Sequence, residues 1–274
     1  MFKLQPLKRH SVKCLGVFRV MSGSMNRISL KPYPLGWKAK VGILLPSQDN
    51  GYGSYEFRML CPDGVVTLET RVMGGRLTMQ NLKRMREDAV YGAELLAAAA
   101  PDVITYEATA ASFILGVEEE KSLITEMQDI TGIKATTGAT AVTESLRFLG
   151  VKKMVIYAAT TEEITLKSVN YFENYGFNVR GHVSLGKENL ADINRITPWE
   201  LYRNVVKFIK SYPDIDGIFL SGGCFRTLEM LATLEKDTGL AVVATAPANM
   251  WHCLRMVGVK DKVLGFGQLL EKSR

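Results

Sequence analysis

Hydrophobic positions along this chain fall into two alternating patterns. Short apolar runs bounded by Gly, Pro, Ser or Asp are typical of strands buried in a parallel sheet. They occur at 41–45, 65–73, 103–107, 133–137, 153–158, 177–184, 216–220 and 241–245. Stretches with apolar residues at helical spacing predict helices at about 81–100, 117–131, 140–149, 162–175, 198–211, 226–238 and 248–257. This alternation predicts an α/β fold built on parallel sheets.

The chain contains an internal sequence repeat. The sequence TGIKATTGATAVTESLRFLGVKKMV at 131–155 aligns with TGLAVVATAPANMWHCLRMVGVKDKV at 238–263 once one residue is inserted. Each copy follows an apolar strand that runs into a turn of small residues, at 104–112 and at 218–226. A repeat of this length predicts two Rossmann-like lobes related by a pseudo-dyad, with strand ends that face each other across a cleft.

The repeat also predicts domain boundaries. We expect a first lobe of residues 36–137 plus 246–274 and a second lobe of residues 138–245, with the active cleft between them. No linker rich in Pro, Gly or Ser separates the lobes, so we expect them to pack closely and to exchange chain segments. With 274 residues, of which 47% are hydrophobic, the chain is long enough to bury a large core.

Composition argues against several function classes. No apolar run approaches the roughly 20 residues that a membrane span needs, so we expect no membrane partner. The four cysteines contain no C-x-x-C pair, and the three histidines are widely spaced. We therefore expect no disulfide framework and no metal site, and a reducing cytoplasm as the compartment.

The net charge of +6 arises at the start of the chain. Nine Lys and Arg residues and no acidic residue precede Asp49, so the remainder is mildly acidic and unlike a nucleic-acid-binding surface. We expect residues 1–35 to be a disordered leader or an over-extended start, outside the fold. Two interpretations stay open for residues 1–24: an organellar transit peptide, or sequence ahead of a start at Met21 or Met25.

In parallel α/β sheets, ligands bind in the loops beyond the carboxyl ends of strands. Here these loops are dense in hydroxyls and small residues. They contain the predicted substrate-binding residues Pro46, Ser47, Asp49, Thr109, Ser112, Thr160, Ser221, Gly222 and Gly223. Hydroxyl and backbone N–H groups can hold a carboxylate without any cation. Simple helix capping favours the same residue types and is the alternative for each loop taken singly.

Two side chains in these loops are candidates for catalysis. Cys224 follows a Gly-Gly turn directly before a predicted helix, whose positive end would lower the pKa of the thiol and suit it to proton transfer. The alternative for Cys224 is a small buried residue. Glu107 ends an apolar strand, where an unpaired carboxylate is costly to bury. It is predicted either to face the cleft as an acid or base, or to pair with an arginine of the neighbouring lobe.

Several of these motifs together resemble the aspartate/glutamate racemase superfamily, and within it the arylmalonate decarboxylase and maleate cis–trans isomerase branch. The resemblance covers about 36–270. It rests on GWKAKVGILLPS at 36–47, T-x-x-S-F at 109–113, TGIKATTGATAVTESLRFLGVKK at 131–153, DGIFLSGG at 216–223 and TGLAVVATAPANMWHCLRMVG at 238–258. It implies a cofactor-independent enzyme whose catalytic residues lie between two pseudo-symmetric α/β lobes.

The chain also departs from the family pattern. Racemases and isomerases of this family use a cysteine from each lobe, whereas the decarboxylase keeps only the second. The resemblance places these two cysteines at Ala108 and Gly222, and neither is cysteine here. The missing first thiol argues against two-cysteine racemisation. A decarboxylase mechanism fits better, with Cys224 as candidate proton donor and an oxyanion held by Thr109, Thr160 and backbone amides near 222–224.

The leading hypothesis is a cofactor-independent lyase or isomerase that acts on a small dicarboxylate by enediolate chemistry in a cradle between the lobes. The alternative is a non-catalytic carboxylate-binding member that has lost both catalytic cysteines. A third interpretation is a scaffold whose lobes serve only oligomerisation. The expected partner is a small dicarboxylate, with no nucleic acid and no membrane, and a homo-oligomer is left open.

Overall fold

A computed structural model describes residues 33–47, 49, 51–74 and 79–272 of the chain. The chain divides into two units, Met1–Tyr33 and Pro34–Arg274, and the second contains every strand and helix given below. The predicted leader at 1–35 lies outside the described residues apart from its last three. Its nature stays a prediction.

The first sheet has four parallel strands in the order β2-β1-β3-β4. They are β1 (Ala39–Pro46), β2 (Val65–Val72), β3 (Val103–Tyr106) and β4 (Lys134–Thr137). The central strands β1 and β3 are buried, and Val41 lies opposite Val103 in their register. The four strands lie where the apolar runs predict them.

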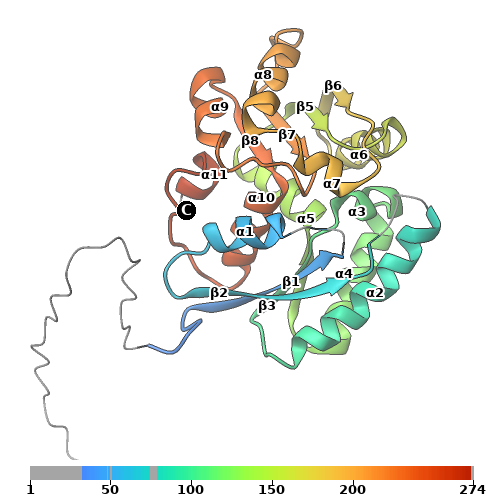
Figure 1. The fold of residues 1–274 in the computed structure, drawn as a ribbon, viewed down its shortest axis with the longest axis vertical. Coiled ribbons are helices and arrows are strands. Elements are labelled where there is room, and N and C mark those ends of the chain that lie inside the picture. The colour runs from blue at the N-terminus through green and yellow to red at the C-terminus, as the bar shows by residue number, and fades with distance from the viewer. Residues whose placement is uncertain (1–32, 48, 50, 75–78, 273–274) are drawn as a thin grey trace, which may run out of the picture. The chain divides into compact units, whose positions relative to one another are not determined.

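The second sheet is also parallel, in the order β6-β5-β7-β8. Its strands are β5 (Lys153–Ala158), β6 (Asn178–Ser184), β7 (Gly217–Ser221) and β8 (Ala241–Ala244). In each sheet the second strand along the chain lies at one edge, followed by the first, third and fourth. The prediction of an α/β fold with two similar parallel sheets is confirmed (Figure 1).

Seven helices were expected from the pattern, and each has a counterpart. These are α2 (Met79–Ala97), α4 (Val117–Thr131), α5 (Gly138–Phe148), α6 (Glu162–Asn174), α8 (Pro198–Ile209), α9 (Leu231–Thr238) and α10 (Thr245–Met256). The helix expected at 226–238 begins only at Leu231, and this boundary was wrong. The backbone N–H and hydroxyl of Thr227 bond to the Glu56 side chain, so this residue is held in a turn.

Four short helices were not expected. They are α1 (Tyr52–Met59), α3 (Thr109–Leu115), α7 (Leu190–Asn194) and α11 (Gln268–Glu271). Helix α1 contains Gly53 and Ser54 in its first turn and follows a loop rich in Gly, Ser and Asn, and α3 begins with Thr109 in a stretch of small residues, so the local pattern at both favours a loop. Tertiary packing overrides this preference, because Phe57 of α1 and Phe113 of α3 are buried in the core.

Two helices link the sheets. Helix α5 follows β4 of the first sheet but also contacts β8 of the second, whereas α10 follows β8 but contacts β3 and β4. The two helices also pack against each other. Each of these helices therefore contacts a strand of the sheet that does not precede it, while the predicted lobes and their boundaries stay a prediction.

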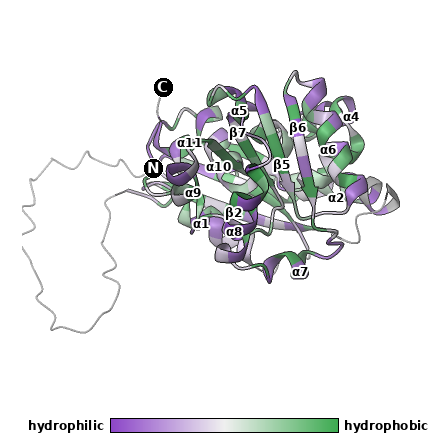
Figure 2. Ribbon diagram, turned by 90° about the horizontal axis from the view of Figure 1, so that it is seen from above, coloured by the Kyte–Doolittle hydropathy of each residue, from purple (hydrophilic) through white to green (hydrophobic). Residues whose placement is uncertain are grey.

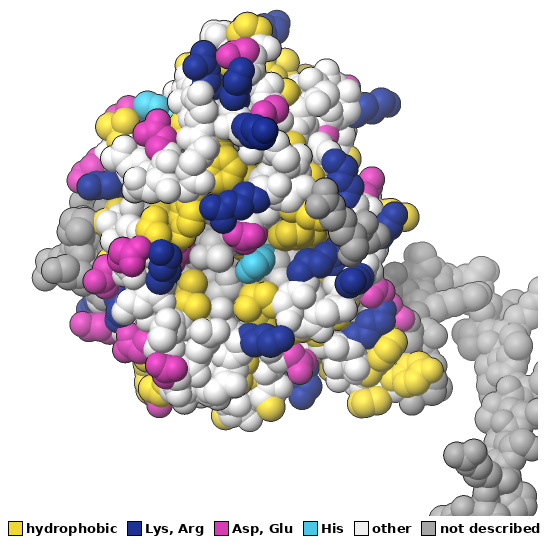
Figure 3. All heavy atoms as spheres, turned by 180° about the vertical axis from the view of Figure 1, so that it is seen from behind, with side chains coloured by type: hydrophobic (Ala, Val, Ile, Leu, Met, Phe, Trp, Pro, Cys, Tyr) yellow, Lys and Arg dark blue, Asp and Glu magenta, His cyan; other side chains and the backbone are white. Residues whose placement is uncertain are grey.

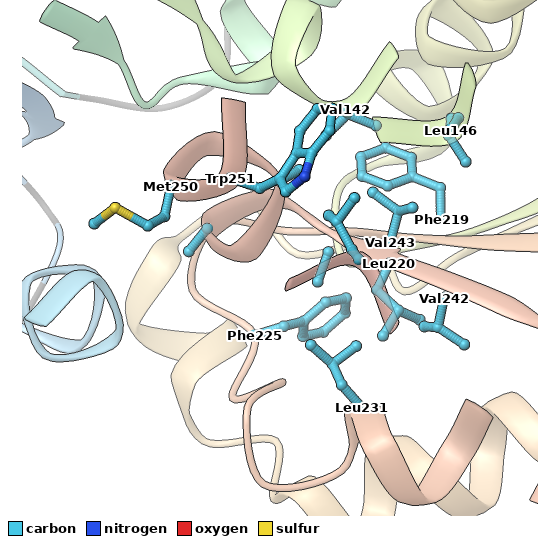
Figure 4. Packing of buried hydrophobic residues seen from close by; sticks show 14 of the residues in the cluster. Val142, Leu146, Phe219, Leu220, Phe225, Leu231, Val242, Val243, Met250 and Trp251 are labelled. Atoms are coloured by element: carbon cyan, nitrogen blue, oxygen red, sulfur yellow. The ribbon is translucent and has the colours of Figure 1, made fainter. Parts of the chain in front are cut away.

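The core of the second sheet is apolar on both sides. Helices α5 and α10 pack on one side of β7 and β8, and the turn after β7 packs with α9 on the other. Figure 4 shows these side chains, among them Val142, Leu146, Trp251, Phe219, Val243, Phe225 and Leu231. Strand β5 is hydrophobic after its first residue, Lys153, and β7 is mainly hydrophobic, while the edge strand β6 is mixed (Figure 2). Such burial makes the two central strands rigid supports for the loops at their ends.

The surface is mixed in charge on the face that Figure 3 shows, where Lys and Arg lie among Asp and Glu. In the described part of the chain, none of the helices combines the length and the apolar character that crossing a membrane requires.

Candidate active site

A pocket lies where the carboxyl ends of both sheets meet. Its walls are the turns after β1, β3, β5 and β7, joined by Met85 of α2 and by Leu190 and Ile193 of α7. The volume within it that the centre of a water molecule can occupy is about 60 Å³. The loops that follow these parallel strands thus converge on one hollow.

Nine of the eleven residues singled out in the sequence line this pocket. They are Pro46, Asp49, Glu107, Thr109, Thr160, Ser221, Gly222, Gly223 and Cys224. The other two lie outside the lining. Ser47 is exposed, and its Oγ accepts a hydrogen bond from the Gly74 N–H at 2.9 Å. Ser112 is buried within α3. The substrate-binding role of these two serines stays a prediction, and their positions do not support it.

Glu107 is buried immediately after β3, with 5% of its surface exposed. Burial, with smaller effects of Glu56 and Asp49, raises the pKa of its carboxyl from 4.5 to about 8. The arginine partner that one interpretation predicts is wrong, since the partner is Asn249 of α10, whose Nδ2 donates to Glu107 Oε2. Among the described residues, Oε1 has no hydrogen-bond partner. At neutral pH the group is therefore largely a neutral acid.

Cys224 is buried and lines the pocket, but not in the environment that the sequence predicts. The helix that should begin beside it begins at Leu231, so no helix end stabilises a thiolate there. Burial, and then the charges of Asp49, Glu107 and Glu56, raise the pKa of the thiol to about 12. The predicted lowering of this pKa is wrong, and Cys224 is a protonated thiol near neutral pH.

Two ionisable groups that the sequence did not single out, Arg71 and Glu56, lie beside this region. Arg71 of β2 donates from Nη1 to Asp49 Oδ2 at 3.0 Å and to the Asp49 carbonyl oxygen at 3.0 Å. Glu56 of α1 is fully buried beside Thr227, and burial raises the pKa of its carboxyl to about 8. No local pattern reveals these roles, because both depend on residues distant in the chain.

The hydroxyls beside the pocket come from both sheets, and that of Thr160 lies 3.3 Å from Thr165 Oγ1. Thr109 begins α3 and Thr160 follows β5, and both line the pocket while being mostly buried. The Ser221-Gly222-Gly223 turn adds backbone N–H groups without bulky side chains. Within the described residues, no cluster of His, Cys, Asp and Glu suits a metal ion.

Comparisons with known proteins place this geometry in context. A family model described as arylmalonate decarboxylase matches residues 61–270. The arylmalonate decarboxylase of Bordetella bronchiseptica is 28% identical over 200 residues, which cover 73% of this chain and 83% of that protein. A maleate isomerase of Geobacillus stearothermophilus is 24% identical over 245 residues, covering 84% and 96%.

Solved structures agree with these sequence similarities. A crystal structure of arylmalonate decarboxylase has a TM-score of 0.73 and 26% identity, covering 85% of this chain and 100% of that one. The maleate isomerase Iso of Pseudomonas putida has a TM-score of 0.80 at 22% identity, covering 86% and 99%. At that identity the second similarity concerns the fold alone.

Proposed function

The chain belongs to the arylmalonate decarboxylase family, and on this premise we propose that it is a cofactor-independent lyase or isomerase of small dicarboxylates. Its relatives make it an enzyme of the decarboxylase or isomerase type. One observation carries the proposal: turns from both parallel sheets close around a single pocket that holds two protonated acids, Glu107 and Cys224.

Binding of the substrate uses one of its carboxylates. The hydroxyl of Thr109 and the backbone N–H groups at 222–224 donate to that carboxylate and to the enediolate that forms from it. Thr160 joins them by exchanging its 3.3 Å contact with Thr165 Oγ1 for the substrate. Donors placed in a buried site stabilise the developing negative charge more strongly than water does. The cradle needs no cation for this role.

In the decarboxylation step, the bond between the α-carbon and the second carboxylate breaks and carbon dioxide leaves. Its bonding electron pair passes to the α-carbon and is delocalised into the remaining carboxylate as an enediolate. A proton from Glu107 or Cys224 then reaches the α-carbon, and water restores the proton to the donor. Both groups are suited to donate because burial keeps both protonated near neutral pH.

The two donors follow strands of different sheets, Glu107 after β3 and Cys224 in the turn after β7. The family cysteines would fall one residue after the first donor and two residues before the second, at Ala108 and Gly222. We propose that these displaced groups take over the protonation that the missing thiols perform in relatives.

The test follows the α-carbon directly. Phenylmalonate, malonate and maleate are incubated with the protein in deuterated water, and product formation and α-deuteration are measured by NMR. We expect turnover of at least one probe. If the thiol is the proton donor, Cys224→Ala reduces this turnover about 10²–10⁴-fold, and if the carboxyl is the donor, Glu107→Gln does so. Cys61→Ala is the matched control, because its thiol lies outside the lining and donates to the Phe57 carbonyl oxygen.

A second candidate function is a non-catalytic carboxylate-binding protein. The absence of cysteine at both Ala108 and Gly222 favours it. Thermal stabilisation by a dicarboxylate without turnover or deuteration of any probe would support this candidate and contradict the enzyme.

A further inference from the structure

A buried chain of hydrogen bonds ends at Glu107. The Thr105 hydroxyl of β3 donates to Asn249 Oδ1 at 2.6 Å, and Asn249 Nδ2 donates to Glu107 Oε2. Thr105 and Asn249 have no exposed surface, and Asn249 lies 142 residues after Glu107 in the chain. The link joins α10, which follows the second sheet, to the end of a strand in the first.

The order of donors in this chain determines which oxygen of Glu107 carries the proton. An asparagine amide has one acceptor oxygen and one donor nitrogen, and Thr105 already occupies the oxygen. In this amide orientation the nitrogen donates to Glu107, so Oε2 is an acceptor. A neutral carboxyl group carries one proton, which is left for Oε1. The flipped amide would donate to the Thr105 hydroxyl and accept the proton of Oε2, and the titration experiment below distinguishes the two orders.

Oε1 is the buried oxygen of this carboxyl that lies next to Gly223. It has no hydrogen-bond partner among the described residues, and a Cβ built at Gly223 would lie 3.6 Å from it. Because residue 223 has no side chain, the position beside Oε1 stays free for a substrate. Glu107 and Gly223 both line the pocket.

Packing holds the amide in place. A Cβ at Gly138, the first residue of α5, would lie 3.1 Å from Asn249 Nδ2. The start of α5 therefore closes against the amide on one side, while Thr105 and Glu107 hold it by hydrogen bonds. Packing and the two hydrogen bonds therefore fix the plane of the Asn249 amide.

We infer that Asn249, oriented by Thr105, is a positioning residue that holds the Glu107 carboxyl with its proton-bearing Oε1 toward the substrate at Gly223. This inference rests on the proposed function in that Glu107 acts as an acid. After proton transfer, the Asn249 N–H also stabilises the carboxylate that remains. Loss of that donor therefore favours the protonated form and raises the pKa of Glu107.

The test uses a property of Glu107 that does not require turnover. Infrared spectra of the full-length protein are recorded between pH 5 and 10, and the carboxyl band of Glu107 is assigned by its loss in Glu107→Gln. We expect this band to titrate near pH 8 in the wild type and about one pH unit higher in Asn249→Leu. Thr105→Val should move it in the same direction, and Thr105→Ser should restore the wild-type titration.

Asn174→Leu, at the exposed end of α6, is the matched control and should leave the band unchanged. For any probe that is turned over, Asn249→Leu should lower kcat at least tenfold, with little change in KM, and shift the pH profile with the band. An unchanged Glu107 titration in folded Asn249→Leu and Thr105→Val overturns the inference, whether or not the protein is active. Absence of turnover by the wild type contradicts the proposed function. The infrared titration of Glu107 still decides whether Asn249 positions this carboxyl, because that measurement needs no turnover.

Discussion

Glu56 Oε1 accepts two hydrogen bonds from Thr227, one from the backbone N–H at 3.4 Å and one from the hydroxyl at 3.2 Å, across 171 positions of sequence. Glu56 lies in α1, and Thr227 lies three residues beyond Cys224 in the turn after β7. The pair therefore ties a helix beside the first sheet to the turn that carries a proposed proton donor.

The first prediction concerns this tie. Thr227→Val removes the hydroxyl donor and leaves the buried Glu56 carboxyl less well satisfied, so we expect the free energy of unfolding to fall by about 1–2 kcal/mol. Urea denaturation measures the change. Thr125→Val, which removes an exposed hydroxyl bonded to a carbonyl oxygen of its own helix, should cost much less. Equal losses in the two variants would contradict the prediction.

The second prediction concerns pH. Burial raises the pKa of Glu56 and of Glu107 from 4.5 to about 8, so the folded protein binds these protons more tightly than the unfolded chain. Their stabilisation is fully present below pH 4.5 and is lost as the pH rises through 8, by at most about 1.4 kcal/mol per pH unit for each group.

Denaturation with urea at pH 5, 7 and 9 checks this dependence. We expect the wild type to lose stability relative to Glu56→Gln and to Glu107→Gln as the pH rises, because an amide does not ionise. If the difference between wild type and either variant stays constant from pH 5 to pH 9, the corresponding carboxyl does not titrate with a raised pKa.

The third prediction concerns the ion pair between Arg71 and Asp49. The Asp49 side chain is almost fully buried, whereas 41% of the Arg71 side chain is exposed, so solvent screens part of the attraction. We expect Arg71→Met to cost about 1–2 kcal/mol and Asp49→Asn to restore part of that loss in the double variant. Arg195→Met, from an exposed pair with Asp192, should cost about 0.5 kcal/mol or less. A coupling free energy of zero between positions 49 and 71 in a double-mutant cycle would show that the ion pair does not stabilise the fold.

The fourth prediction concerns Gly138 at the start of α5. Alanine is the better helix former, so helix propensity alone favours Gly138→Ala. A Cβ there would lie 2.8 Å from Thr109 Cγ2, however, and we expect a net loss of about 1–3 kcal/mol in thermal or urea unfolding. Gly223→Ala is the matched control, since its Cβ would make only an ordinary contact with Glu107 and should leave the fold intact. Increased stability of Gly138→Ala would show that α3 and α5 can accommodate a methyl group at position 138 without a steric clash.

Much of the fold could be predicted because its signals are local. The apolar runs at 41–45 and 153–158 become central strands, and the repeated segments at 131–155 and 238–263 correspond to matching strand-helix units. Short helices such as α1 and α3 could not be predicted, because their composition is typical of turns. They are helical because Phe57 and Phe113 pack into the core. Thr109, Thr160 and the Ser-Gly-Gly turn were found for a topological reason: loops at the carboxyl ends of parallel strands share one edge.

The sequence by itself determined the two parallel sheets, the family resemblance and the loops that line the pocket, because strand and helix periodicities and motifs are written in neighbouring residues. Only the tertiary structure decided the state of the groups in those loops. No helix begins beside Cys224, and burial raises the pKa of its thiol, so the thiol is protonated near neutral pH. The hydrogen-bond partner of Glu107 is Asn249 and not an arginine. The physical reason is that pKa depends on burial and on nearby charges and hydrogen-bond donors, which here come from residues more than a hundred positions away.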